Sequence, residues 1–324
     1  MVAPAVHSAE RVTLARLPSG VEVATTVHTY ASPANGPTVY VQAAQHGREV
    51  NGTAVLRRLH DRLVDASIAG RVVAVPVANP LTFDRVSYTT PEPLDSVHSN
   101  MNRVWPGDAD GTLHERMAAR LWTYASDADA AVDLHTGSPE LLTHVVYRDG
   151  DATARALAEA FGTDLLLAEA AGDDAADEWH RRNFAGKFRV AAAREGIPAI
   201  TPELAHNKQI VEDAVEAGVD GTLNVLRHLG VLPGAPDPAA PTVARNHLGR
   251  VDAVDAGLFR PHPDRALGER VDEGTPLGTL YDPTSYEVLQ EATADDAGIL
   301  YAITREATVA AGGKLANVAI PRAE

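Results

Sequence analysis

The sequence contains no cysteine, and only three of its 28 basic residues are lysines. The absence of thiols excludes a disulfide framework, a thiolate zinc site and a cysteine nucleophile. Any metal ion that this chain binds must therefore be held by histidine, aspartate and glutamate side chains.

Acidic residues outnumber basic ones, since 44 aspartates and glutamates stand against 28 lysines and arginines, and the formal net charge is therefore −16. This charge argues against a nucleic-acid backbone or an anionic membrane as a partner, since both attract basic surfaces. An acid excess with almost no lysine is typical of the hydrated surface of halophilic proteins, although a GC-rich genome would also replace lysine by arginine.

Long apolar segments are missing as well. No stretch approaches the length needed to cross a bilayer, and the N-terminus has no basic region followed by an apolar run. We therefore expect a soluble, cytoplasmic protein, either a monomer or a homo-oligomer.

With 324 residues, of which 45% are hydrophobic, the chain can bury a large core in one big domain or in a large and a small one.

The segment 41–52, VQAAQHGREVNG, places a histidine and a glutamate where a strand is expected to end. Alternating residues before them predict a strand, and apolar residues at helical spacing predict a helix over about 49–66. His46 and Glu49 therefore lie in a strand-to-helix turn, at the sheet edge where open α/β proteins bind ligands. Both residue types bind zinc, but an H-x-x-E pattern is common by chance, and Glu49 also suits an ordinary helix start.

A histidine at a second strand end decides between these interpretations. His135, in the segment DLHTG, follows a short apolar strand. Two histidines, one glutamate and an open water position form a common type of catalytic zinc site. We therefore predict one zinc ion per chain, held by His46, Glu49 and His135. Asp133 is expected either to orient the His135 ring or to face solvent or cap a helix.

Strand and helix patterns alternate along the first two thirds of the chain and predict an α/β domain over residues 1–232. Within it, the polar connection 82–111 has no regular period, and a loop of that length inside a domain is usually functional. The segment 231–241 is rich in proline and glycine and reads as a linker. Short strands beyond it predict a small all-β domain over 241–324.

These motifs together resemble the aspartoacylase and succinylglutamate desuccinylase family of zinc-carboxypeptidase-like hydrolases. The family's H-G-x-E turn matches residues 46–49, and its D-L-H motif matches residues 133–135. The resemblance covers about residues 35–230 and implies a three-layer fold with a mixed sheet flanked by helices. The tail resembles the family's C-terminal domain, which is similar to a biotinyl/lipoyl-type barrel. Arg48 departs from the pattern, because family members usually have asparagine there.

The resemblance also implies roles for four further residues. Asn102 and Arg103 match a pair that grips a substrate carboxylate, and Arg85 matches an upstream arginine that would stabilise the oxyanion. Glu203 matches the glutamate that takes the proton from water and passes it to the leaving amine. Surface positions remain open for Arg85 and Arg103, and an ion pair or a helix cap for Glu203. The implied reaction is hydrolysis of the amide bond of a small N-acyl amino acid or related carboxylate, with an undetermined acyl group.

Other functions are compatible with the same ligands. A zinc carboxypeptidase would release C-terminal amino acids from peptides, whereas a non-catalytic metal-binding protein would not need Glu203. A carrier of biotin or lipoate is not expected, because Lys314, the only lysine after the linker, lies outside the hairpin where the modified lysine should be. The remaining histidines, among them His60 and His144, are expected at ordinary surface or core positions.

Overall fold

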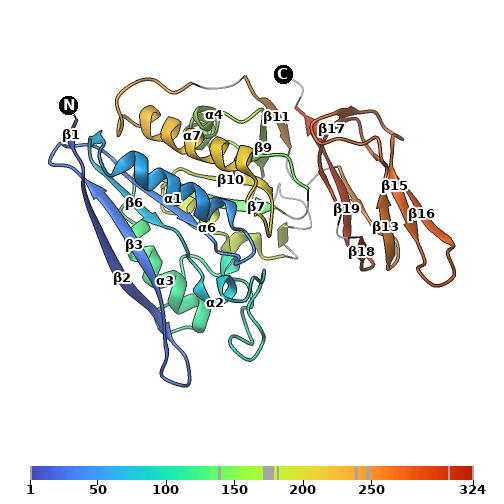
Figure 1. The fold of residues 1–324 in the computed structure, drawn as a ribbon, viewed down its shortest axis with the longest axis horizontal. Helices are drawn as coiled ribbons and strands as arrows, with labels where there is room; N and C mark the ends of the chain where they lie inside the picture. The colour runs from blue at the N-terminus through green and yellow to red at the C-terminus, as the bar shows by residue number, and fades with distance from the viewer. Residues whose placement is uncertain are drawn as a thin grey trace.

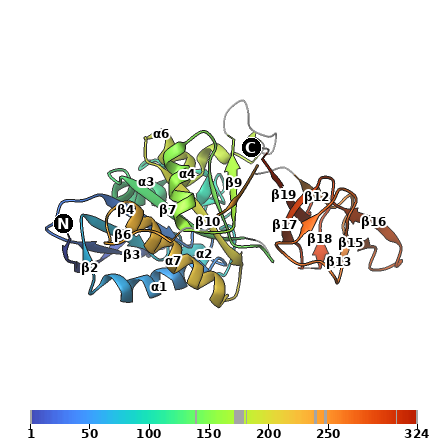
Figure 2. The same ribbon diagram turned by 90° about the horizontal axis from the view of Figure 1, so that it is seen from above.

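The computed structural model describes residues 2–137, 140–170, 179–180, 182–237, 240–245, 249–305 and 307–322. Within these residues, thirteen strands form one mixed sheet, and helices pack against both faces of its N-terminal part (Figure 1). The predicted three-layer α/β fold is therefore confirmed. The N-terminal hairpin and the C-terminal strands lie at opposite ends of the molecule in both views (Figure 2).

The strands that carry the candidate site belong to the N-terminal part of this sheet. In chain order they are β2 (Val6–Arg16), β3 (Glu22–Ala31), β4 (Thr38–Ala43), β6 (Arg71–Val75), β7 (Ala130–Gly137), β8 (His144–Arg148), β9 (Leu165–Glu169) and β10 (Ala199–His206). β6, β4, β7 and β10 are neighbours and run parallel, and β8 pairs with β10 antiparallel. Since helices cover both faces, β4 and β7 are buried almost throughout and read as apolar runs.

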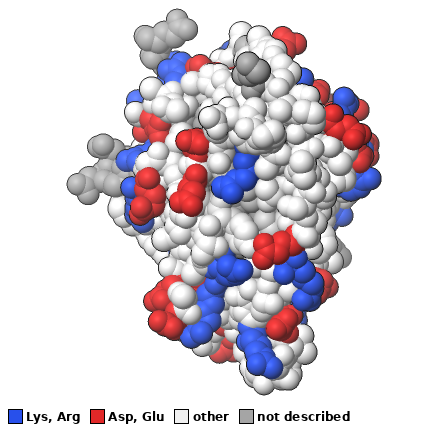
Figure 3. Space-filling model, turned by 90° about the vertical axis from the view of Figure 1, so that its left-hand side faces the viewer, with Lys and Arg blue, Asp and Glu red and all other residues white. Residues whose placement is uncertain are grey.

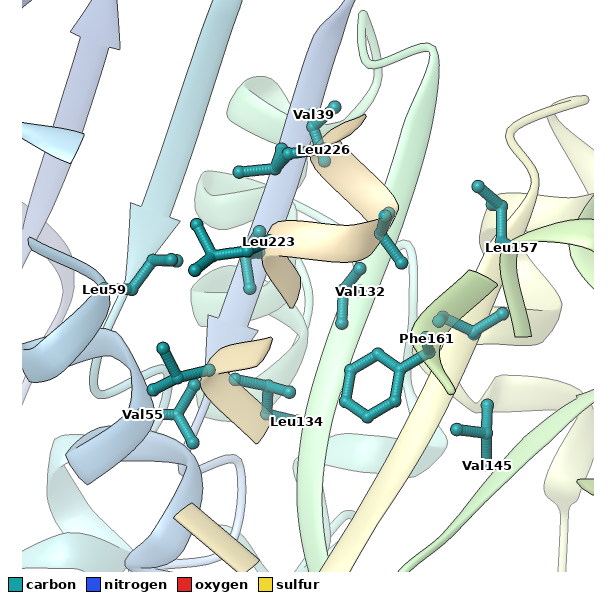
Figure 4. Close-up of a cluster of buried hydrophobic side chains, with 14 of the residues drawn as sticks. Val39, Val55, Leu59, Val132, Leu134, Val145, Leu157, Phe161, Leu223 and Leu226 are labelled. Carbon is teal, nitrogen blue, oxygen red and sulfur yellow. The ribbon is translucent and has the colours of Figure 1, made fainter. Parts of the chain in front are cut away.

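Two hydrophobic cores hold the helices against the sheet. The first contains side chains of α1 (Asn51–Leu63), α4 (Ala152–Phe161) and α7 (Glu212–His228), and the second contains side chains of α3 (Leu113–Ala125) and α6 (Phe188–Arg194). In the first core, Leu59 of α1 and Leu223 of α7 belong to the same buried cluster as Val132 of the sheet (Figure 4). The α3 helix begins with a capping box between Thr112 and Glu115, which fixes the start of this helix.

The elements around the ligand motifs agree with the predictions, with small shifts in their bounds. The helix predicted from residue 49 begins at Asn51. The polar connection 82–111 contains, as regular structure, only the end of α2 (Pro80–Phe83) and the 3₁₀ helix η1 (Met101–Arg103). Glu203, which the resemblance matches to a catalytic glutamate, lies inside β10, and this strand continues to His206 with a shift of register after Glu203.

All described elements after residue 240 are strands, as predicted for the tail. They are β11 (Thr242–Arg245), β12 (Arg250–Asp252), β13 (Gly257–Pro261), β14 (Arg270–Val271), β15 (Pro276–Tyr281), β16 (Val288–Thr293), β17 (Gly298–Ile303), β18 (Thr308–Val309) and β19 (Lys314–Pro321). β13, β15, β16 and β18 form a separate antiparallel sheet. β11 pairs with both β9 and β19, so the large sheet continues across the predicted linker, of which residues 238–239 lie outside the described part.

The charged surface is mixed on the side that carries the N-terminal hairpin. Lysine or arginine and aspartate or glutamate side chains are interspersed there among uncharged residues, without one dominant patch of either sign (Figure 3). None of the described helices combines the length and the apolar character needed to cross a membrane. The remaining short elements are β1 (Ala3–Pro4), which pairs with β5 (Ser67–Ile68), and the 3₁₀ helix η3 (Phe184–Gly186).

Candidate metal centre and active site

The structure brings the three predicted metal ligands together. His46 and Glu49 lie in the turn between β4 and α1, and His135 lies in β7, the strand that pairs with β4. One potential ligand atom from each residue lies within 4.8 Å of the other two, and all three side chains are buried. Gly47 permits this turn, because a Cβ atom there would lie 1.9 Å from the carbonyl carbon of Thr82.

The His46 ring is oriented through its Nδ1 atom. Nδ1–H donates to the carbonyl oxygen of Tyr88 at 2.9 Å, which leaves Nε2 as the atom with a lone pair. The Tyr88 ring stacks on the imidazole with a centroid distance of 3.9 Å. Burial lowers the pKa of His46 to about 4, so the ring is neutral at pH 7, as a metal ligand must be.

His135 lies between two carboxylates. Its Nε2 atom is 2.9 Å from Oδ2 of Asp133, and its Nδ1 atom is 2.9 Å from Oε2 of Glu49. Although burial lowers the pKa of His135, the charges of Asp133 and Glu49 outweigh burial and raise it well above the usual value. The two carboxylates of Asp133 and Glu49 therefore stabilise positive charge at the position between them. Donation of Nε2–H to Asp133 leaves Nδ1 facing Glu49, which is the arrangement in which a carboxylate orients a ligand imidazole.

Asp133 is itself held by two amide groups. Gln42 donates to Oδ1 at 3.0 Å, and Gln45 donates to Oδ2 at 2.8 Å and to Oδ1 at 3.0 Å. Trp105 fixes Gln45 in turn through a 2.7 Å hydrogen bond from its indole nitrogen to the amide oxygen. Of the roles considered for Asp133, the structure therefore shows the orienting contact with His135.

Glu203 lies beside the three ligands. Residues Glu203 and His135 are register partners on the parallel strands β10 and β7, and Glu203 also faces His144 on β8. Burial, with an added contribution from Glu49, raises the pKa of Glu203 to about 7. A carboxyl group with this pKa can both accept and release a proton near neutrality.

A cavity of about 410 Å³ opens at these residues. Among the described residues, seven basic side chains line it, compared with the two carboxylates Asp133 and Glu203. Lys187 and Lys314 are two of the three lysines in the chain. In a chain with a formal charge of −16, this local excess of positive charge favours an anionic ligand.

Several buried polar atoms at the cavity lack a hydrogen-bond partner within the described structure. They are Nε of Arg48, Oγ1 of Thr136, Nε of Arg189 and Oδ1 of Asn317. Because a buried polar group without a partner costs free energy, their presence at one cavity indicates a polar ligand or ordered water there.

Asn102 and Arg103, predicted to bind substrate, both reach the cavity. The Asn102 side chain is engaged by the protein, because Oδ1 accepts from the backbone N–H of Phe188 at 2.9 Å and Nδ2 lies 3.3 Å from His135 Nε2. Arg103 donates from Nε to the carbonyl oxygen of Arg182 at 2.7 Å and stacks on the Phe184 ring at 4.7 Å. These contacts hold the guanidinium of Arg103 in place. Within the described residues, no carboxylate forms an ion pair with it.

Arg85 is the predicted site residue that the structure does not bring to the cavity. Its side chain is exposed, and it is not among the cavity-lining residues. Arg48 lines the cavity instead, with its guanidinium 4.8 Å from the Tyr88 ring centroid. Arg48 reaches the cavity because it lies in the turn between the two ligands His46 and Glu49. Arg85 does not reach it, because it lies on the outer side of the loop.

Sequence reasoning missed His144, Lys187 and the contribution of the C-terminal strands. His144, expected at an ordinary position, lines the cavity with its Nδ1–H donating to the carbonyl oxygen of Leu142 at 2.8 Å. Lys187 pairs with Glu169 at 2.8 Å, and burial lowers the pKa of Lys187 to about 8. Lys314 enters from β19. The scarcity of lysine could have identified Lys187 and Lys314 as candidate site residues from the sequence. In a chain that uses arginine for most of its positive charge, the few lysines are less easily explained as general surface charge.

Comparisons with known proteins agree with this arrangement. The family model for the succinylglutamate desuccinylase/aspartoacylase catalytic domain matches residues 35–229. N-alpha-acetyl-L-2,4-diaminobutyric acid deacetylase of Halomonas elongata is 30% identical over 310 residues, which cover 90% of this chain and 84% of that protein. A succinylglutamate desuccinylase/aspartoacylase structure from Rhodobacter sphaeroides is 25% identical with a TM-score of 0.82, over 99% of this chain and 97% of that one. The product-bound ectoine utilization protein EutE (DoeB) of Ruegeria pomeroyi is 24% identical, with a TM-score of 0.82 over 98% and 96% of the chains, and shares the fold.

Proposed function

Since the chain belongs to the succinylglutamate desuccinylase/aspartoacylase family, we propose that it is a zinc-dependent deacylase that hydrolyses the amide bond of a small N-acyl amino acid or related carboxylate. The observation that supports this most directly is the gathering of His46, Glu49 and His135 beside Glu203, at a cavity lined mainly by basic side chains.

The three ligand residues fit a zinc ion. Two imidazoles and one carboxylate are a known catalytic donor set, and each imidazole has its second nitrogen engaged by an oxygen that orients the ring. The neutral His46 and the carboxylates around His135 supply lone pairs and negative charge for a divalent cation. When bound, zinc would lower the pKa of water and polarise the acyl carbonyl.

Glu203 performs the proton transfers in this proposal. Its carboxylate accepts the proton of the attacking water and then donates that proton to the nitrogen of the leaving amine. Its raised pKa of about 7 suits both steps near neutral pH. Arg48, whose Nε atom is buried without a partner, is placed to donate to the oxyanion that develops from the acyl carbonyl. Arg48 thus takes the oxyanion-binding role that the family resemblance implied for Arg85.

The substrate carboxylate is assigned to Arg103. Two carbonyl oxygens and the Phe184 ring hold its guanidinium in place, so little conformational entropy is lost when an anion binds. Asn102 supports the site by contacting His135 and the backbone of Phe188 rather than by donating to substrate. The deacetylase relative acts on an N-acetylated amino acid, which supports an acyl-amino-acid substrate for this chain.

Two alternatives are less well supported. A cavity of about 410 Å³ is at the small end of ligand sites, which favours a small acyl amino acid over a peptide chain. A non-catalytic metal-binding protein would not require Glu203, whose raised pKa and position beside His135 suit proton transfer.

The test is a screen of N-acyl amino acids against the zinc-loaded protein, with release of the free amine as the readout. The panel contains N-acetyl and N-succinyl derivatives of acidic, basic and neutral amino acids, together with peptides that have free C-termini. We expect cleavage of N-acyl amino acids, with acidic ones preferred because of the basic cavity. Release of C-terminal amino acids from peptides without deacylation would instead establish the carboxypeptidase, and no cleavage at all would favour the metal-binding protein.

A further inference from the structure

Three histidines from distant parts of the chain meet outside the active site. His7 lies in β2, His28 lies in β3, and His60 lies in the last turn of α1. One ring nitrogen from each lies within 4.8 Å of the other two, and all three residues are half-buried. His60 lies nine positions after Asn51, the first residue of α1, so at a rise of about 1.5 Å per residue it is roughly 13 Å along the helix from the turn that carries Glu49.

The spacing of the first pair suits a shared metal ion. Nε2 of His7 is 3.1 Å from Nδ1 of His28. Two nitrogen ligands on a tetrahedral ion with bonds of 2.0–2.1 Å would be about 3.3 Å apart. A contact between two ring nitrogens requires a proton between them when no metal is present, and a metal ion would occupy that position instead.

The third ring is already oriented by a buried hydroxyl group. Nδ1 of His60 is 2.8 Å from Oη of Tyr30, which is only 2% exposed. A phenol oxygen can accept as well as donate, so Nδ1–H can donate to it and leave Nε2 as the ligand atom. The His7 and His60 rings are in contact, with centroids 4.8 Å apart. Metal-binding imidazoles usually have their second nitrogen fixed in this way.

The local chemistry favours a borderline transition metal. Three imidazoles supply nitrogen donors of the kind that Zn²⁺, Ni²⁺ and Cu²⁺ prefer, and burial lowers the pKa of His7 and of His28, which favours their neutral, metal-binding form. The neighbouring carboxylate, Asp61, is engaged by Arg57 at 2.6 Å, so calcium and magnesium, which need several oxygen ligands, are disfavoured. The hairpin side of the molecule also shows charges of both signs rather than an acidic patch (Figure 3).

We propose that His7, His28 and His60 form a second metal site, which binds one Zn²⁺, Ni²⁺ or Cu²⁺ ion with water in the remaining position. Such an ion would connect β2, the edge strand of the large sheet, to helix α1. Its role is therefore structural, because it would tie the N-terminal hairpin to the helix that begins next to Glu49. This inference is independent of the proposed deacylase activity.

The experiment separates the two sites by mutation. Tag-free protein carrying His46→Ala and His135→Ala lacks the catalytic ligands, so any stoichiometric binding that remains reports the second site. Zn²⁺ and Ni²⁺ are titrated calorimetrically, and bound metal is counted by mass spectrometry after dialysis. We expect one ion per chain in this double variant, two in the wild type, and a rise in Tm of the double variant when either metal is added.

Further variants identify the ligands. Adding His28→Ala to the double variant should abolish the remaining binding and the rise in Tm, and adding His7→Gln, a milder change on the edge strand, should do the same. The matched control is His228→Ala, which removes an exposed histidine at the end of α7 and should change neither. The proposal is overturned if the folded double variant binds no ion, or if His7→Gln and His28→Ala leave its binding intact. Failure of the deacylase proposal would appear separately, as absence of amine release by wild-type protein that holds its catalytic metal.

Discussion

Replacement of Asp133 by asparagine should weaken zinc binding without removing a ligand. All four contacts to this carboxylate come from donors, namely two from Gln45, one from Gln42 and one from His135. An amide of the same shape can accept at only one of its two positions, so its NH₂ group must face a donor whichever way it is flipped. The His135 ring then loses either its partner or its fixed orientation.

The expected loss is about 10- to 100-fold in zinc affinity, or about 1.4–2.7 kcal/mol, which is the usual effect of removing a carboxylate that orients a ligand imidazole. Zinc affinity is measured by competition with a chelator of known strength, and amine release is followed as zinc is added. Activity of Asp133→Asn should recover substantially at saturating zinc, because His46, Glu49 and His135 remain.

A matched control is Asp129→Asn, just before the same strand. Asp129 accepts from the backbone N–H of Thr38 at 2.8 Å and is exposed, outside the cavity. It should leave zinc affinity unchanged, although a small loss of stability is expected. If Asp133→Asn binds zinc as tightly as the wild type while folding normally, the orienting role argued for Asp133 is wrong.

Four further outcomes are expected. Glu203→Gln should keep its zinc and lose on the order of a hundredfold or more in turnover, and unchanged turnover would remove it from the mechanism. Arg103→Ala should cost about 2–5 kcal/mol in kcat/KM for an N-acyl amino acid but much less for its methyl amide, whereas exposed Arg85→Ala should stay within about 0.5 kcal/mol of wild type for both. Burial lowers the pKa of His144 to about 4 from 6.5, so the unfolded chain binds more protons between these values and stability falls as pH falls through them. In urea melts without metal, His144→Gln should therefore remove about 2 kcal/mol of the stability lost between pH 7 and pH 5. If the acidic, lysine-poor composition reflects halophily, Tm should rise between dilute buffer and molar KCl, and an unchanged Tm would leave GC bias as the explanation.

The ligand motifs were predictable because their information is local. A strand pattern followed by a helix pattern places His46 and Glu49 in a turn, and the apolar run before His135 places it in a strand. Parallel strands present their carboxyl ends at one edge of a sheet, so the meeting of these residues followed from two separate local patterns. The roles left open for Asp133 show where local patterns stop, since only the folded structure shows that Asp133 contacts His135 and is held there by Gln42 and Gln45.

The residues that line the rest of the cavity were not predictable in this way. Arg85 and Arg48 have similar chemistry, but their positions differ because the 82–111 loop folds back with Tyr88 toward His46 and leaves Arg85 outside. Lys187 reaches the cavity just before α6, and Lys314 reaches it from β19, far along the chain. The periodicity of the sequence does not predict which loops and strands meet at the cavity, because their meeting depends on long-range packing.

The sequence by itself determined the alternation of strands and helices, the absence of thiol chemistry and the choice of His46, Glu49 and His135 as the predicted ligands of a catalytic metal ion. These features depend on residue type and on spacing within one turn of helix or one pleat of strand. Only the tertiary structure decided the basic lining of the cavity, the place of Arg85 and the meeting of His7, His28 and His60. Such features arise when segments tens to hundreds of residues apart are packed against one sheet, and the free energy of that packing is shared by the whole core rather than carried by any local pattern.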